Sequence, residues 1–281
     1  MQGTVERVFE RERQHQGAKK QRMLSLFNGR AAQRACKGYL YCLSSLWYAW
    51  NGGAGGSRRA TCTERCMGLL SVVNEGAMAY NDFTLDTLIA QFSLQVQEES
   101  NYFTLFAPLP ISDLLRQILQ ENVPLALDIS TEKARSEFII APVLSEVRRQ
   151  LDHRISLFSG VEFNVNPEQG LRGVCDFLLS LSPLQLTIQA PVVMVVEAKN
   201  ENVKQGISQC IAEMLAAQQF NHERRNAIET VSGVVTTGSV WKFLRLTGTS
   251  VMVDTTEYHI SQVERIVGIL VAMLQEAAGS A

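Results

Sequence analysis

The chain has 281 residues, of which 46% are hydrophobic and 19% charged, a composition that supports a packed core and excludes global disorder. Its formal net charge of -2 argues against a strongly basic nucleic-acid-binding protein. No apolar run approaches the roughly 18–20 residues that cross a membrane, so we expect a protein without a membrane partner.

The charge is divided unevenly along the chain. Residues 1–80 carry a net charge of +7, whereas residues 81–281 carry −9. The basic part has little hydrophobic periodicity and contains a Gly-rich stretch at residues 51–59. We therefore expect residues 1–77 to be a disordered or spurious N-terminal extension, with the native start at or near Met78 and one folded domain at 78–281. The alternative is a basic arm that supplies affinity for DNA.

The cysteines indicate the cellular compartment. Four of the six lie at positions 36, 42, 62 and 66, and their spacing does not match a paired CxxC zinc site. Without a convincing export signal, we interpret all six as free thiols of a reducing compartment, and we expect a cytoplasmic protein.

From residue 84 onward the chain alternates between helical and strand-like patterns. The strand-like run at 192–199 is continuously β-branched and apolar, which is typical of a strand buried on both faces. The order predicts an α/β fold with a central mixed β-sheet flanked by helices. The predicted helices are 84–97, 113–120, 132–151, 201–220 and 261–274, and the predicted strands are 155–166, 173–180, 192–199, 231–237, 240–246 and 250–260.

Charged residues interrupt two of these apolar strands. Five apolar residues run directly into Glu197-Ala198-Lys199, and Glu197 and Lys199 project to the same side because side chains alternate along a strand. Asp176 interrupts the strand before. If the two strands pair as a hairpin, both carboxylates and the lysine converge on one site.

A divalent cation is the simplest way to stabilise two neighbouring carboxylates, which otherwise repel each other. Mg²⁺ (or Mn²⁺) prefers such oxygen ligands and keeps several waters. Lys199 beside it would orient or help to deprotonate a water. The residues therefore predict metal-dependent hydrolysis of a phosphodiester.

At this point the sequence resembles the PD-(D/E)xK nuclease superfamily. Asp176, about twenty intervening residues and Glu197-x-Lys199 match its motif, although Cys175 stands where the family has proline. Gly233 to Phe243 resembles the following strand pair of type I restriction and related prokaryotic proteins. The resemblance covers roughly residues 82–277.

The resemblance implies a restriction-endonuclease-like core and further site residues. The family has an acidic residue on a preceding helix, for which Glu137 is the preferred match and Glu146 the reserve. Asp176, Glu197 and Glu137 would hold the metal. A glutamine on the following helix is matched by Gln209, or less well by Gln205. The implied function is an endonuclease that cleaves DNA, and many such proteins act as homodimers.

Other interpretations stay open from the sequence alone. The fold could be a catalytically inactive binding or assembly module in a nucleic-acid-associated complex, which the acidic net charge favours. A hydrolase of small phosphorylated molecules is a third option. Glu197 and Lys199 could be a surface ion pair, and Glu137 a solvated glutamate. Two basic clusters are either solvated or phosphate-binding: Arg148, Arg149 and Arg154, and His222, Arg224 and Arg225.

Overall fold

A computed structural model describes residues 78–201 and 203–279, which belong to one compact unit, Ala77–Ala281. Residues 1–77 lie outside the described residues. The expectations of a disordered or spurious extension or a basic arm in this range, and of free thiols at four of the six cysteines, therefore stay predictions. Between residues 78 and 279, no helix combines the length and hydrophobicity that crossing a bilayer requires.

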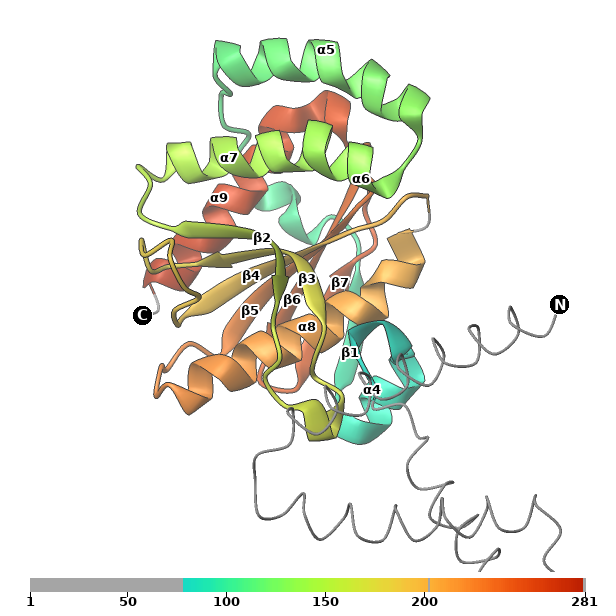
Figure 1. Ribbon diagram of the computed structural model, residues 1–281, viewed down its shortest axis with the longest axis vertical. Coiled ribbons are helices and arrows are strands. Elements are labelled where there is room, and N and C mark those ends of the chain that lie inside the picture. Colours follow the sequence, from blue (N-terminus) through green and yellow to red (C-terminus); the bar gives the residue numbers. More distant parts are fainter. Residues whose placement is uncertain (1–77, 202, 280–281) are drawn as a thin grey trace, which may run out of the picture. The chain divides into compact units, whose positions relative to one another are not determined.

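The described unit is a mixed β-sheet between two layers of helices (Figure 1). Its α-helices are α4 (Leu85–Phe92), α5 (Asp113–Ile129), α6 (Glu132–Arg135), α7 (Ala141–Gln150), α8 (Val203–Glu223) and α9 (Val263–Gly279). Its strands are β1 (Gln95–Glu99), β2 (Ser156–Glu162), β3 (Val174–Ser180), β4 (Val192–Ala198), β5 (Thr230–Thr236), β6 (Val240–Thr247), β7 (Ser250–Asp254) and β8 (Tyr258–His259).

The strands lie in the order β1-β7-β6-β5-β4-β3-β2, and β8 pairs with β6. β4 runs parallel to β5, and β1 runs parallel to β7, while the other pairs are antiparallel. Between β3 and β4, Phe177 lies opposite Val196. The next position in this register brings Asp176 beside Glu197, as the hairpin hypothesis requires.

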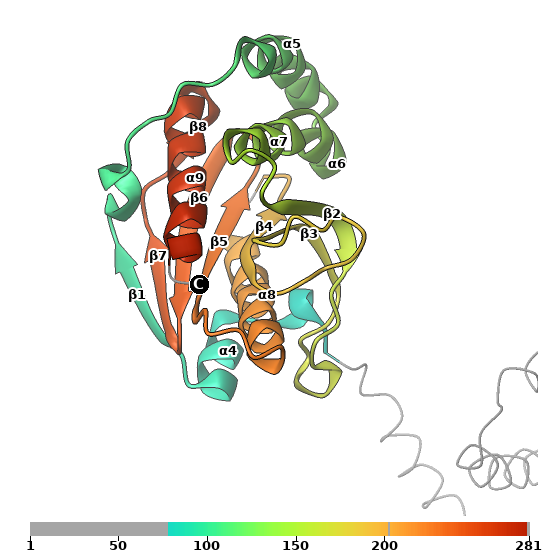
Figure 2. The same cartoon turned by 90° about the vertical axis from the view of Figure 1, so that its left-hand side faces the viewer.

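Both faces of the sheet are covered, which explains the unbroken apolar run in β4. All seven residues of β4 are buried. Val196 packs in the core on the face covered by α5, α7 and α9, whereas Val195 packs in the core beneath α4 and α8 (Figure 2). β4 is therefore central, and any charge at its end is held by a rigid element.

The prediction of an α/β fold with a central mixed sheet flanked by helices is confirmed. The predicted N-cap of α5 is also present, since the Ser112 hydroxyl accepts a hydrogen bond from Leu115 N at 3.1 Å. The helix then continues through Pro124 to Ile129, well beyond the predicted end at residue 120.

Two other predicted elements were wrong in extent, and a third is helical throughout. The helix predicted over 84–97 ends at Phe92, because Ser93 adopts a left-handed conformation and the next residues form β1. The helical region predicted over 132–151 is confirmed, and a π-helical segment, Ser136–Ile140, joins α6 to α7 within it. The strand predicted over 250–260 is divided into β7 and β8.

Candidate active site

Asp176, Glu197 and Lys199 meet where β4 ends. The backbone N–H of Ala198 donates to Asp176 Oδ2 at 2.8 Å, which holds this carboxylate against the end of the neighbouring strand. Lys199 Nζ forms an ion pair with Glu197 Oε1 on the same side of the strand. The Glu197 side chain is 1% exposed, and that of Lys199 is 20% exposed, so the ammonium has the access to solvent that its carboxylate partner lacks.

Helix α8 adds two more polar side chains to this group. Lys199 Nζ donates to Gln209 Oε1 at 3.1 Å, and Gln209 Nε2 donates to Glu213 Oε1 at 3.1 Å. Glu213 is fully buried. We refer to Asp176, Glu197, Lys199, Gln209 and Glu213 as the carboxylate cluster.

Gly206 allows α8 to approach Lys199 closely. A Cβ atom at this position would lie 2.5 Å from Val235 Cγ1 and 3.1 Å from Lys199 Cγ. Contacts as short as the first do not occur between real side chains, so a larger residue would displace the helix, the strand or the lysine. The glycine therefore helps to place Lys199 beside Gln209.

Burial and mutual repulsion control the protonation of the carboxylates. Burial, and then the charge of Asp176, raise the pKa of Glu197 from 4.5 to about 7. Burial also raises the pKa of Asp176, and burial followed by the charge of Glu197 raises the pKa of Glu213 well above its ordinary value. For Lys199, burial alone would lower the pKa, but the Glu197 carboxylate outweighs it and raises the pKa. The lysine is therefore charged at neutral pH.

The cluster is incompletely satisfied. Glu197 Oε2 and Glu213 Oε2 are buried and have no hydrogen-bond partner. A buried carboxylate oxygen without a partner is costly, and such atoms are rare in folded proteins. The two carboxyl groups are close enough to share a hydrogen bond when one is protonated.

The donor set also fits a hard cation. Within the described residues, no three His, Cys, Asp or Glu side chains are arranged to hold a metal ion together. Mg²⁺ requires fewer protein ligands, since one or two carboxylates commonly bind it, and waters and substrate phosphates complete its shell. Asp176 and Glu197, with its unpartnered oxygen, meet that requirement.

Glu137 has a partner outside the cluster. It lies in the π-helical segment, its side chain is 53% exposed, and it pairs with Lys133 at 2.8 Å. Among the described residues, none of the five cluster side chains is a partner of Glu137. These contacts do not support the prediction that Glu137 belongs to the site. They agree with the alternative interpretation, in which Glu137 is a solvated glutamate on the helix surface.

The reserve, Glu146, has a structural partner instead. Its buried carboxylate accepts hydrogen bonds from Ser112 N at 3.0 Å and Ser112 Oγ at 2.9 Å, and it pairs with Arg149. Through these contacts, Glu146 links the start of α5 to α7.

Two carboxylates near Lys199 were missed by the sequence interpretation. Glu132, in the first turn of α6, lies close enough to raise the pKa of Lys199, and Glu213 belongs to the cluster itself. A signal for Glu213 was available, because residues four apart on a helix share a face and Gln209 was already a candidate. For Glu132 no comparable signal exists, since only folding brings it near Lys199.

The arginines of α7 and the following turn are occupied by local contacts. Arg148 Nε donates to Ile155 O at 3.1 Å, and Arg154 Nε donates to Leu151 O at 3.3 Å. In the second basic cluster, Arg224 stacks on the Phe220 ring, 3.5 Å from its centroid. These contacts hold the turns that follow α7 and α8.

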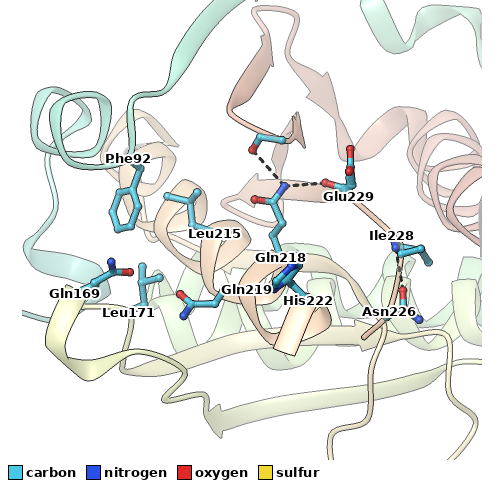
Figure 3. Close-up of a pocket in the computed structure, with 12 residues that line it drawn as sticks. Phe92, Gln169, Leu171, Leu215, Gln218, Gln219, His222, Asn226, Ile228 and Glu229 are labelled. Atoms are coloured by element: carbon cyan, nitrogen blue, oxygen red, sulfur yellow. Dashed lines mark hydrogen bonds between the residues drawn. The ribbon is translucent and has the colours of Figure 1, made fainter. Parts of the chain in front are cut away.

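A hollow of about 510 Å³ lies along the last turns of α8 (Figure 3). Neutral amides provide much of its polar lining. Gln218 Nε2 donates to Glu229 O at 2.8 Å and to Gly248 O at 3.2 Å, and Asn226 Oδ1 accepts from Ile228 N at 3.0 Å. The lining is completed by Phe92, Gln169, Leu171, Leu215, Gln219, His222, Ala227, Ile228 and Gly248.

Comparison of the sequence with models of protein families and with curated proteins found no match. Inferences about chemistry therefore depend on the geometry of the carboxylate cluster. Two carboxylates that fit a hard cation, beside a charged lysine at a strand end, can bind and activate a phosphate ester and a water.

Proposed function

We propose that residues 78–281 form a metal-dependent phosphodiesterase, an endonuclease that cleaves DNA. One observation carries the proposal: Asp176, Glu197 and Lys199 meet at the end of β4, and Glu197 Oε2 is buried without a partner. In its charged form a carboxylate held in this way is expensive to keep unless it binds a cation, and burial raises its pKa to about 7. A divalent cation is the ligand that would match its charge.

The arrangement of elements supports a restriction-endonuclease-like core. The resemblance noted in the sequence calls for an acidic strand residue, an adjacent strand ending in ExK and a following helix that carries glutamine. Here β3 carries Asp176, β4 leads into Lys199, and α8 carries Gln209. Glu132 is a better placed acidic residue on the preceding helix than Glu137.

Each side chain has a distinct role in the proposed reaction. Asp176 and Glu197 would hold Mg²⁺ or Mn²⁺, which when bound supplies positive charge against the charge that develops on the phosphate. The Lys199 ammonium has three N–H groups, of which Glu197 and Gln209 accept two. The third remains for the attacking water or a phosphate oxygen. Gln209 fixes the position of the ammonium.

DNA binding by this acidic unit would depend on few contacts. Residues 81–281 carry a net charge of −9, so they cannot neutralise many phosphates at once. We therefore expect the affinity of the site for DNA to depend strongly on the divalent cation.

The test is cleavage of a substrate panel by the full chain. Supercoiled plasmid, single-stranded DNA and RNA are incubated with Mg²⁺ or Mn²⁺, using wild type, Asp176→Ala and the matched control Glu137→Gln, which removes an exposed carboxylate. We expect metal-dependent cleavage of DNA by the wild type and the control, and none by Asp176→Ala. Cleavage that persists unchanged in Asp176→Ala would contradict the proposal.

A non-catalytic binding or assembly module is the second candidate, and the net charge of −9 favours it. Titration calorimetry separates the two. The phosphodiesterase predicts that the wild type binds Mg²⁺ or Mn²⁺ and that Asp176→Ala does so more weakly. The module predicts no metal binding and no cleavage of any substrate in the panel.

A further inference from the structure

Glu213 is a buried carboxylate that accepts a hydrogen bond from an amide and lies beside the Glu197 carboxyl group. It lies four residues after Gln209 on α8, so both side chains project from the same face of the helix. Gln209 Nε2 donates to Glu213 Oε1 at 3.1 Å, and Gln209 Oε1 accepts from Lys199 Nζ at 3.1 Å. The amide therefore bridges Glu213 and Lys199, and each end of it contacts one partner.

The two ends of a glutamine amide are chemically different, and this fixes its orientation. The NH₂ group can only donate, and the carbonyl oxygen can only accept. If the Gln209 amide turned over, its NH₂ would face the Lys199 ammonium, donor against donor. The oxygen of Gln209 would then face the Glu213 oxygen that now accepts from it. Both hydrogen bonds would be lost in a buried environment, at the cost of leaving polar groups unpaired.

We propose that Glu213 is a positioning residue: it holds the Gln209 amide with its oxygen toward Lys199 and thereby keeps the ammonium beside Glu197. This inference rests on the proposed phosphodiesterase for its catalytic consequence. Its structural part, the control of Gln209 by Glu213, stands on the two hydrogen bonds alone. Without Glu213, the amide loses one of the two partners that select its orientation, and Lys199 gains freedom to leave the cluster.

Two substitutions at this position separate positioning from folding. Glu213→Gln keeps a carbonyl oxygen that can accept from Gln209. Glu213→Met removes every acceptor but fills a similar volume. Glu213→Met relieves the repulsion between Glu213 and Glu197 but leaves Gln209 Nε2 without its acceptor, so its fold is checked by circular dichroism before exchange is measured. Gln218→Ala, on the same helix but at the hollow, is the matched control for loss of an amide.

The first measurement is independent of activity. In the full chain labelled with ¹⁵N-glutamine, the side-chain amide signal of Gln209 is assigned by its disappearance in Gln209→Ala. We expect slow hydrogen exchange of this amide in the wild type and in Glu213→Gln. In Glu213→Met the exchange should be at least tenfold faster. An unchanged exchange rate in Glu213→Met overturns the positioning role.

The second measurement is kinetic. We expect Glu213→Met to lower kcat about 10–100-fold with little change in KM, as is typical for groups that orient an active-site residue. Glu213→Gln should recover most of that loss. Gln209→Ala should cost about as much as Glu213→Met, and the double variant should cost no more than either. If the reductions in kcat of the two single variants multiply in the double variant, Glu213 and Gln209 act independently, and the positioning role is contradicted.

The two measurements distinguish the two proposals. If the wild type cleaves none of the substrates, the proposed function fails, and amide exchange alone decides whether Glu213 positions Gln209. If the wild type cleaves DNA and Glu213→Met cleaves it equally fast, the positioning role fails while the proposed function stands.

Discussion

The two ends of α8 face very different surroundings. In its first half, Gln209 and the mid-helix residue Glu213 join a compact cluster of charged groups, two of whose carboxylate oxygens are buried without partners. Near its end, Gln218 and its neighbours line a hollow of about 510 Å³ in which the amide of Gln218 is held by two backbone carbonyls (Figure 3). The hollow therefore lies toward one end of the helix, and the buried carboxylate oxygens without partners lie toward the other.

This difference teaches that the size of a cavity and its chemical capacity are separate properties. Neutral amides that bond to the backbone stabilise the chain around the hollow, and among the described residues Glu229 supplies the one carboxylate of its lining. Buried carboxylates with raised pKa values carry a free-energy cost that binding of a cation would offset. The reactive end of α8 is therefore expected to be the carboxylate cluster, and substitutions at the two ends should have very different effects.

The largest effect is expected from Glu197→Gln. The amide keeps the shape of the side chain but loses the charge that pairs with Lys199 and that a cation requires. We expect the initial rate of Mg²⁺-dependent DNA cleavage to fall by about 10²–10⁴-fold, the range typical for loss of a group that acts on the reacting atoms. A rate within twofold of wild type would place the chemistry elsewhere.

Gly206→Ala should have the next largest effect, through packing. Its Cβ atom would lie 2.5 Å from Val235 Cγ1 and 3.1 Å from Lys199 Cγ. Overpacking of this kind costs about 1–3 kcal/mol of unfolding free energy, more than the helix preference for alanine returns. Urea denaturation measures this loss, and cleavage assays should show slower turnover because Lys199 is displaced.

Gly279→Ala is the control for that substitution. A Cβ atom at Gly279, at the end of α9, would have no atom within 4 Å, so its unfolding free energy should match the wild type. Equal stability of both variants would mean that α8 and Lys199 have room to adjust.

A smaller effect is expected on the pH dependence of stability. The pKa of Glu197 is raised from 4.5 to about 7, so between these pH values the folded chain holds a proton that the unfolded chain has released. The contribution of this group to stability is therefore complete below pH 4.5 and is lost as pH rises through about 7. The unfolding free energy from urea denaturation should show this loss across the window.

Glu213→Met sharpens that prediction, because it removes one member of the interacting pair. Its unfolding free energy should depend less steeply on pH across the same window, while Glu137→Gln, an exposed carboxylate, should keep the wild-type dependence. Identical profiles for all three proteins would show that the buried pair does not control the titration.

The smallest effect is expected at the hollow. Gln218→Ala removes hydrogen bonds to Glu229 O and Gly248 O, which should cost about 0.5–1.5 kcal/mol of unfolding free energy. Cleavage of DNA should proceed at the wild-type rate, because the charged groups at the other end of α8 are untouched. A loss of activity as large as that of Glu197→Gln would remove the distinction between the two ends.

The part of the fold that positions the cluster could be predicted from sequence because its signals are local. Val192 to Val196 is a continuous apolar run, and the strand before it and the helix after it each have their own pattern. Asp176 and Glu197 then meet through a simple antiparallel register.

Elements that depend on distant pairing could not be predicted in the same way. Gln95 to Glu99 is polar and becomes a strand only because β7, about 150 residues later, pairs with it. The surroundings of Glu137 could not be predicted for a related reason, since it lies in the π-helical segment Ser136–Ile140. A π-helical turn contains an extra residue, which rotates the side chains that follow, and hydrophobic spacing does not reveal where such a turn occurs.

The most direct test of the account compares wild type with Lys199→Ala in the cleavage of supercoiled plasmid by the full chain with Mg²⁺. Lys199 is the charged group that the cluster holds toward solvent, so its loss should remove the positioned water while leaving the buried carboxylates in place. The account predicts metal-dependent cleavage by the wild type and an initial rate lower by about 100-fold or more in Lys199→Ala. Equal rates for the two proteins, or no cleavage by either, would contradict it.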